Sequence, residues 1–254
     1  MINIILSGCG GRMGNAIIRA AAESKDCRVI AGVDMNVSAV APACSFPVYQ
    51  SISEFPGKAD VIVDFSHHTA LPSLLSYATQ TQTPLVVATT GHTEEERAAL
   101  LAATETVAVF SSGNMSIGIN LLIELAKNAS KTLGTAFDVE IVEKHHNQKL
   151  DAPSGTALMI ADAIGTTREE TDYVYDRHSV RQKRDPREIG IHSIRGGTIV
   201  GEHEVIFAGN NETISLTHTA TSREVFATGA LRAATYLAGK SAGLYDMSDL
   251  INGR

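Results

Sequence analysis

Residues 2–14 read INIILSGCGGRMG, a short apolar run that passes directly into a cluster of glycines. Helical apolar spacing follows over residues 15–24, and a second apolar run at residues 27–33 ends on Asp34. Short buried strands that alternate with helices are typical of a parallel sheet with helices on both faces. This stretch therefore predicts a strand, a glycine loop, a helix and a second strand of a Rossmann-like α/β domain.

The alternation continues through the first half of the chain. Apolar runs predict three more strands, at residues 59–65, 85–89 and 106–111. Helical spacing predicts helices at residues 69–79 and 93–103, and the second begins with a threonine and three glutamates that suit a helix start. The whole pattern favours one parallel sheet whose strands are joined by helices.

The second half of the chain has a different pattern. Helices are predicted at residues 116–133 and 154–164. Strands are predicted at residues 137–143, 189–195, 198–207 and 213–219. Gly196-Gly197 and Asn210-Asn211 lie between the last three strands, where we expect hairpin turns. These elements predict a second, α+β domain with a mixed and largely antiparallel sheet.

The two domains are expected to be interleaved along the chain. Residues 223–237 return to helical spacing, rich in alanine, and we expect them to pack back on the first domain. The first domain would then comprise residues 1–115 and 223–254, and the second residues 116–222. Residues 168–188 are charged and weakly periodic, which indicates a surface excursion.

The composition limits the possible functions. With 44% hydrophobic and 19% charged residues, the chain of 254 residues can bury a core and is not a disordered protein. The net charge is −7 with no basic block, so we expect no nucleic-acid partner. No apolar run approaches the length that crosses a bilayer, so we expect no membrane partner. Three scattered cysteines and no apparent secretion signal favour the cytoplasm.

The glycine loop indicates a dinucleotide. Without side chains, the backbone lets a pyrophosphate approach free N–H groups at the start of the helix. Asp34 follows the loop by about 20 residues, where a carboxylate can accept hydrogen bonds from an adenosine ribose. Met35 and Asn36 offer no cation for a 2′-phosphate, so NADH is favoured, while NADPH stays possible because Arg12 could reach a phosphate. The alternative is a glycine turn that only connects strand to helix.

Two later loops are candidate nicotinamide contacts. Ala88-Thr89-Thr90-Gly91 follows one predicted strand, and Ser112-Gly113-Asn114-Met115 follows the next. Ligands of open parallel sheets lie outside the carboxyl ends of the strands. Ordinary polar loops are the alternative for both. His67-His68 follows an earlier strand; it could line the cofactor crevice, but a loop with a helix cap is favoured. Cys9 is interpreted as a small filler of the glycine loop.

The richest stretch is residues 143–157, EKHHNQKLDAPSGTA. Ser154 is a natural N-cap, which places Gly155 and Thr156 in the first turn of a helix. Their N–H groups, with lysine and histidine nearby, make a site for carboxylates. His145 or Lys149 could donate a proton at neutral pH.

Three other interpretations explain this stretch less well. A metal site at His145 and His146 has no third ligand at a recognisable spacing, so we expect no metal. A nucleophilic Ser154 lacks the G-x-S-x-G elbow. A solvated polar loop would not explain so many donors beside a helix cap. The scattered histidines at positions 178, 192, 203 and 218 carry no signal.

Several motifs, taken in order, resemble one family. GCGGRMG, ATTG, SSGNMSIG, EKHHNQKLDAPSGTA and, at residues 222–230, SREVFATGA are similar to 4-hydroxy-tetrahydrodipicolinate reductase, also called dihydrodipicolinate reductase. The resemblance implies a reductase of the diaminopimelate branch of lysine biosynthesis. It also implies a cytoplasmic homotetramer assembled through the sheet of a substrate-binding second domain.

The resemblance also assigns residues. It places cofactor contacts at Gly8, Cys9, Gly10, Gly11, Arg12, Met13, Asp34, Ala88, Thr89, Thr90, Ser112, Gly113, Asn114 and Met115. It makes His145 the proton donor/acceptor and Lys149 the proton donor, with substrate contacts at His146, Gly155 and Thr156. Three positions depart from the family pattern, which often has a basic residue at 35, a glycine at 88 and a phenylalanine at 115.

The implied reaction suits these residues. The substrate is a cyclic imine dicarboxylate, so the enzyme must neutralise two carboxylates and supply one proton. A related alternative is another nicotinamide-dependent reductase of a dicarboxylate or amino acid, similar to aspartate dehydrogenase. A dinucleotide-binding regulator without catalysis and a metal hydrolase are more distant alternatives.

Overall fold

The computed structural model describes residues 1–253 and divides into two compact units. Unit 1 comprises residues 1–117 together with the chain from Arg223 onward, and unit 2 comprises residues 118–222. The first segment of unit 1 ends at Ile117, where the sequence led us to expect Met115. Each unit is built around its own sheet.

Unit 1 contains a seven-stranded sheet in the order β12-β6-β5-β4-β1-β2-β3. All of its pairings are parallel, which confirms the predicted Rossmann-like class. Its strands are β1 (Ile2–Ser7), β2 (Cys27–Val33), β3 (Val48–Tyr49), β4 (Val61–Asp64), β5 (Leu85–Val87), β6 (Ala108–Ser111) and β12 (Gly243–Tyr245). The edge strands β3 and β12 were not predicted, because two or three residues show no periodicity.

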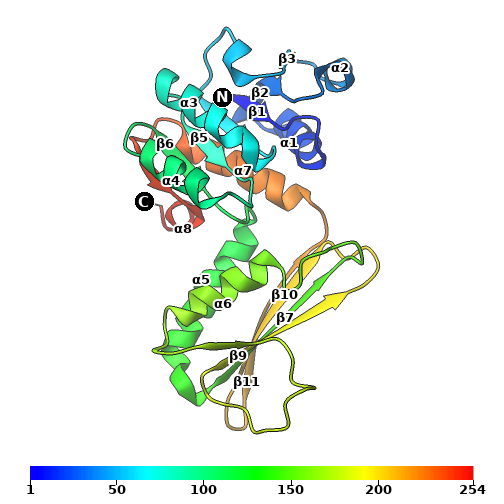
Figure 1. Cartoon of the computed structure of the whole chain (residues 1–254), viewed down its shortest axis with the longest axis vertical. Helices are drawn as coiled ribbons and strands as arrows, with labels where there is room; N and C mark the ends of the chain where they lie inside the picture. The colour runs from blue at the N-terminus through cyan, green and yellow to red at the C-terminus, as the bar shows by residue number, and fades with distance from the viewer. Residues whose placement is uncertain (254) are drawn as a thin grey trace. The chain divides into compact units, whose positions relative to one another are not determined.

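Helices cover both faces of this sheet (Figure 1). They are α1 (Arg12–Glu23), α2 (Val37–Val40), α3 (Leu71–Thr81), α4 (Glu94–Ala103), α7 (Glu224–Leu237) and α8 (Met247–Asn252), with 3-10 turns at Ala41–Ala43, Ile52–Glu54 and His68–Ala70. Among residues 1–253, no helix is long and apolar enough to cross a membrane.

The sequence accounts for how the sheet of unit 1 is buried. Successive residues of a strand point to opposite faces, so Ile4 and Leu6 pack against α1 and α7, whereas Ile5 packs against α3. Helix α4 begins at a capping box in which Thr93 and Glu96 bond each other's backbone, as its sequence predicted. The sheet is thus fixed between two apolar clusters, and the polar loops lie at its carboxyl edge.

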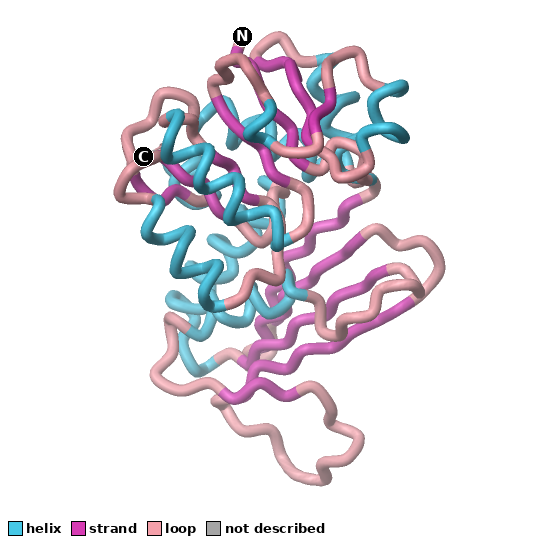
Figure 2. The backbone as a smooth tube through the Cα atoms, turned by 45° about the horizontal axis from the view of Figure 1, so that its top comes forward, coloured by secondary structure: helices cyan, strands magenta, loops and turns pink. Residues whose placement is uncertain are grey.

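Unit 2 contains a five-stranded sheet in the order β11-β10-β7-β9-β8. Figure 2 shows its longer strands side by side in magenta. Its strands are β7 (Asp138–His145), β8 (Asp172–Val174), β9 (Glu188–Arg195), β10 (Gly201–Ala208) and β11 (Thr213–Ala220). Helices α5 (Ile117–Leu133) and α6 (Gly155–Gly165) pack on one face of it, and a 3-10 turn at Gly134–Ala136 follows α5. The short β8 lies within the segment that was interpreted as a surface excursion.

The pairing in this sheet differs from the prediction in one respect. Strand β7 lies between β9 and β10, so Gly196-Gly197 is not a hairpin turn. The β7–β9 and β8–β9 pairings are parallel, so the sheet is mixed in equal measure rather than largely antiparallel. The reason is that α6 connects β7 to β8 and a long loop connects β8 to β9, and crossovers of this kind bring strands together in parallel. The Asn210-Asn211 hairpin between β10 and β11 is confirmed.

Strand β7 alternates between a buried and a half-buried face, and its apolar residues other than Val142 lie on the buried one. Val139 and Ile141 occupy the buried face with the apolar side chains of α5 and α6. The same alternation continues to Glu143 and His145, so two polar groups stand on the buried face where the strand ends.

Candidate active site

The glycine loop of unit 1 forms a cradle that side chains would fill. Gly8 has φ +77°, and a Cβ there would lie 2.5 Å from the carbonyl oxygen of Phe65. A Cβ at Gly14 would lie 2.3 Å from the carbonyl oxygen of Gly8. Helix α1 begins after Gly11 without a side-chain cap, so its first N–H groups have no side-chain acceptor. A bare backbone before an uncapped helix fits the pyrophosphate of a dinucleotide.

Asp34 lies beside this loop, at the end of β2. One oxygen of its carboxylate accepts a hydrogen bond from Gly10 N at 2.9 Å, and the other accepts from Asn36 N at 3.0 Å. Both Asp34 and Met35 line a cavity of about 720 Å³, and Met35 is 81% exposed. The carboxylate is therefore held rigidly at the wall of a cavity large enough for a nucleoside.

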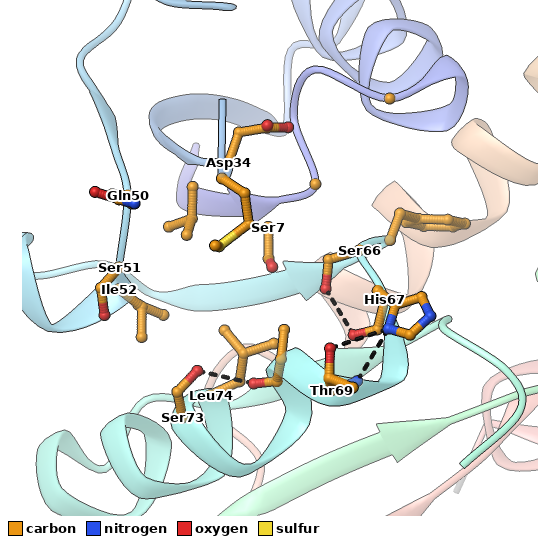
Figure 3. Close-up of a pocket in the computed structure, with 16 residues that line it drawn as sticks. Ser7, Asp34, Gln50, Ser51, Ile52, Ser66, His67, Thr69, Ser73 and Leu74 are labelled. Atoms are coloured by element: carbon orange, nitrogen blue, oxygen red, sulfur yellow. Dashed lines mark hydrogen bonds between the residues drawn. The ribbon is translucent and has the colours of Figure 1, made fainter. Parts of the chain in front are cut away.

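The remaining walls of this cavity come from three loops and the first turn of α3 (Figure 3). Gln50, Ser51 and Ile52 face Ser66 and His67 across it. No sequence signal singled out residues 50–52, because they connect a two-residue strand to a short 3-10 turn. The ring of His67 accepts a hydrogen bond from Thr69 N, which confirms the interpretation of His67 as a helix cap.

A second cavity of about 370 Å³ brings together the two loops predicted to contact the nicotinamide. Thr89 and Thr90 line it after β5, and Ser112 and Gly113 line it after β6. The fully buried Asp64 fixes the first of these loops, because its carboxylate accepts a hydrogen bond from Thr89 Oγ1 at 2.7 Å. The sequence predicts Asp64 only as part of the strand at residues 59–65 and gives no sign of this contact.

The other predicted cofactor residues of unit 1 differ in exposure. Cys9 and Met115 are buried in its apolar core, at 1% and 2% exposure. Burial, with Cys44 and Asp34 nearby, raises the pKa of Cys9 to about 12, which agrees with its interpretation as a filler. Arg12 is exposed and makes no ion pair among residues 1–253.

In unit 2, Glu143 is the centre of the polar cluster at the end of β7. Its side chain is fully buried. Its carboxylate accepts hydrogen bonds from His145 Nδ1 at 2.6 Å, from both terminal nitrogens of Arg195 at 2.7 Å and from Ser154 N at 3.0 Å. Burial alone would raise the pKa of Glu143, but the bonds from His145 and Arg195 hold it well below its usual range. The carboxylate is therefore ionised at neutral pH.

Helix α6 begins beside this carboxylate. The hydroxyl of Ser154 accepts a hydrogen bond from Ala157 N at 3.1 Å, which confirms Ser154 as the N-cap. Gly155 and Thr156 then lie in the first turn, as predicted. A Cβ at Gly155 would meet no atom within 4 Å, so there is open space at the start of the helix.

Lys149 and His146 lie in the loop between β7 and α6. Lys149 Nζ is 2.9 Å from Asp151 Oδ1, and His146 is half-buried. Burial would raise the pKa of Asp151, but hydrogen bonds from Lys149 and from the backbone lower it. Gly196 N donates to the carbonyl oxygen of His145 at 2.9 Å, so the Gly196-Gly197 loop holds this segment although it is not a hairpin.

His203 belongs to the same cluster, although its sequence context gave no signal. It lies on β10, opposite Glu143 in the register, and is only 4% exposed. Its Nε2 is 3.1 Å from Ser154 Oγ, and its ring packs edge to face against His145 with centroids 5.2 Å apart. Burial lowers the pKa of His203 to about 3, so this ring is neutral. Only pairing between distant strands brings these residues together.

The two units offer different chemistry. Unit 1 has a cradle for phosphates and a carboxylate for a ribose. Unit 2 has an amine, an imidazole with an ionised partner and a helix start with open space, which together suit an anionic substrate that must be protonated. Across residues 1–253, no group of three or more His, Cys, Asp or Glu side chains is placed to hold a metal ion. The chain is a nicotinamide-dependent oxidoreductase.

Comparison with known proteins identifies the family. Models described as the N-terminus and the C-terminus of dihydrodipicolinate reductase match residues 2–115 and 118–251. A 4-hydroxy-tetrahydrodipicolinate reductase from Caldanaerobacter subterraneus subsp. tengcongensis is 52% identical over 252 residues, which cover 99% of this chain and 98% of that protein. One from Clostridium tetani is 47% identical over 253 residues, 99% of this chain and 98% of that protein. The chain belongs to the dihydrodipicolinate reductase family.

A solved structure shares the fold over nearly the whole chain. It is dipicolinate-bound dihydrodipicolinate reductase from Paenisporosarcina sp. TG-14, with a TM-score of 0.80 and 24% identity over 97% of each chain. At this identity the likeness concerns the fold, and the α/β class predicted from the sequence is confirmed.

Proposed function

We propose that the residues gathered in the two units serve one reaction, reduction of the dehydrated form of 4-hydroxy-tetrahydrodipicolinate to tetrahydrodipicolinate. This is the reduction step of diaminopimelate and lysine biosynthesis, and family membership favours it over an aspartate dehydrogenase-like activity. The observation that carries the chemical assignment is the cluster of His145 and Lys149 beside the open start of α6.

Unit 1 binds the cofactor in this proposal. The N–H groups at the start of α1 hold the phosphates, and Asp34 accepts hydrogen bonds from the ribose. The loops at Thr89-Thr90 and Ser112-Gly113 hold the nicotinamide ring in the second cavity. When bound, the nicotinamide supplies the hydride.

Unit 2 binds the substrate and supplies the proton. His146, together with the N–H groups of Gly155 and Thr156, stabilises the carboxylates. The reaction needs one proton, and either Lys149 or His145 donates it, His145 from Nε2 when its ring is doubly protonated. His203 is neutral, so it adds no positive charge that would attract the substrate. Its part in the cluster is to pack against His145.

The test is oxidation of NADH by the purified chain with the aldehyde–pyruvate condensation product as substrate. A steady loss of NADH absorbance that depends on this substrate supports the proposal. A keto dicarboxylate with ammonia serves as the comparison, because an aspartate dehydrogenase-like enzyme would use that pair. Turnover with the second pair alone would overturn the proposal.

NADH is the favoured cofactor in this proposal, although NADPH is also used by the class. Asp34 and Met35 line the cavity beside the glycine loop, and no lysine or arginine of residues 1–253 lines it. A carboxylate without a neighbouring cation attracts the ribose hydroxyls of NADH and repels the 2′-phosphate of NADPH.

The family resemblance supports a proposal for the assembly and the location. We propose a cytoplasmic homotetramer joined through the sheet of unit 2, as the resemblance implies. Ile194 on β9 supports this, because it is 45% exposed at the face of the sheet opposite α5 and α6. Light scattering after gel filtration measures the mass, and a monomer that is fully active would contradict the tetramer.

A further inference from the structure

The buried Glu143–Arg195 pair joins the three segments that carry the chemistry of unit 2. Glu143 lies on β7 and Arg195 on the parallel strand β9, where Arg195 is opposite His145 in the register. The two side chains meet through a bidentate contact, with both N···O distances 2.7 Å. A paired guanidinium and carboxylate of this geometry hold each other's orientation closely.

Each member of the pair also holds a second group. Glu143 accepts from His145 Nδ1 at 2.6 Å and from Ser154 N at the start of α6 at 3.0 Å. Arg195 donates to the carbonyl oxygen of Asp151 at 2.6 Å. Asp151 lies in the same loop as Lys149, and its carboxylate pairs with the Lys149 amine. One ion pair therefore connects the imidazole, the lysine loop and the helix start.

We propose that Glu143 and Arg195 are the positioning residues of the reaction, with Glu143 fixing His145 as the Nδ1–H tautomer and Arg195 fixing the loop of Lys149. This inference rests on the proposed function for its kinetic consequences. It goes beyond that function because neither residue contacts the substrate or cofactor in it.

The tautomer follows from the partners of Glu143. An ionised carboxylate only accepts hydrogen bonds, and Glu143 already accepts them from Arg195 and Ser154 N, so the imidazole must present Nδ1–H to it. His145 Nε2 is then left for proton exchange with the substrate. Space near Nε2 is kept because residue 201 is a glycine, where a Cβ would lie 3.2 Å from that nitrogen.

Glu143→Gln is the discriminating variant, since it keeps the shape and removes the charge. Its amide NH₂ would face donors of Arg195, Ser154 or His145 at either oxygen position, and the imidazole can adapt by moving its proton to Nε2. The same exchange behind a catalytic histidine traps the wrong tautomer in other enzymes. We expect kcat to fall by about 10²-fold, the scale for losing a positioned acid, with KM little changed.

Three matched variants separate positioning from folding. Glu143→Asp keeps the charge and should recover much of the lost kcat. Arg195→Lys keeps the positive charge but loses the bidentate contact, so it should lower kcat less than Glu143→Gln does. Glu202→Gln removes a carboxylate from the neighbouring strand, where Glu202 pairs with Lys144, and should leave kcat unchanged. NADH affinity, a property of unit 1, should be unchanged in all of them.

The direct readout is nitrogen-15 NMR of the imidazole nitrogens at alkaline pH, assigned with a His145→Asn variant. We expect the proton on Nδ1 in the wild type and on Nε2 in Glu143→Gln. A wild-type proton on Nε2, or a folded Glu143→Gln enzyme with wild-type kcat, would overturn the inference. If Glu143→Gln does not fold, the wild-type spectrum still tests the tautomer and the kcat of Arg195→Lys still tests positioning. A wild type inactive with the substrate would instead refute the proposed function, and the spectrum would still test the tautomer.

Discussion

Replacing Met35 with arginine should raise affinity for NADPH and leave affinity for NADH almost unchanged. Met35 is 81% exposed and follows Asp34 at the wall of the larger cavity. The replacement therefore removes little buried surface. The bonds of Asp34 to Gly10 and Asn36 do not involve the side chain of residue 35. The new guanidinium would lie within reach of a 2′-phosphate that only NADPH carries.

The size of the effect follows from the contact that is added. A hydrogen bond to a charged group contributes about 1.5–3 kcal/mol, and about 1.4 kcal/mol is a factor of ten in binding. Repulsion between Asp34 and the phosphate opposes this gain. We therefore expect NADPH to bind Met35→Arg about 10-fold more tightly than it binds the wild type. By the same arithmetic the wild type prefers NADH by several-fold to about 100-fold.

The assay is fluorescence titration of both cofactors, with kcat/KM for each. Met35→Gln is the matched control, because it has similar length and no charge. Added salt should shrink the gain of Met35→Arg, since it screens the guanidinium–phosphate attraction. An equal gain for both cofactors would contradict a phosphate-specific contact. A wild type that binds NADPH more tightly than NADH would refute the ribose argument, and Arg12 would then be the first residue to examine.

Three further outcomes are expected. Lys149→Ala and His145→Ala should each lower kcat by about 10²-fold or more without changing NADH affinity in a binding titration, and a near-wild-type kcat in either variant would remove that residue from the chemical step. Gly14→Ala should weaken NADH binding and lower the melting temperature, because its Cβ would lie 2.3 Å from the carbonyl oxygen of Gly8; unchanged binding would argue against the cradle. His203→Gln should flatten the loss of stability in acid. The pKa of His203 is lowered by burial to about 3, so below pH 6.5 the unfolded chain takes up a proton that the folded chain does not. Stability should therefore fall with pH between about 6.5 and 3 by up to about 1.4 kcal/mol per pH unit, and urea unfolding across that range should show a smaller slope in the variant.

Much of the fold can be read from local patterns in the sequence. The strands β1 and β2 follow from their apolar runs with the bounds that the structure has. The capping box of Thr93 and the N-cap at Ser154 follow from residue types at fixed offsets. These features depend on interactions within a few residues, so a single sequence contains them. The motifs that resemble a known family also predicted the reaction.

The candidate site was predicted where its residues are close in sequence. His145, Lys149 and the start of α6 lie within one loop, so their clustering required no knowledge of the sheet. Arg195 and His203 are about 50 residues further along the chain, and their neighbours offer no motif. Both enter the site only because β9 and β10 flank β7.

The sequence by itself determined the period of each element, its caps and the glycine cradle, because each depends on the backbone within a turn or a strand. Only the tertiary structure decided which strands pair, and with them the Glu143–Arg195 contact and the position of His203. The crossovers through α6 and through the loop between β8 and β9 placed β9 parallel to β7, which no turn signal at Gly196-Gly197 could reveal. Pairing across a sheet is set by the packing of distant apolar faces, a property of the whole unit rather than of any segment.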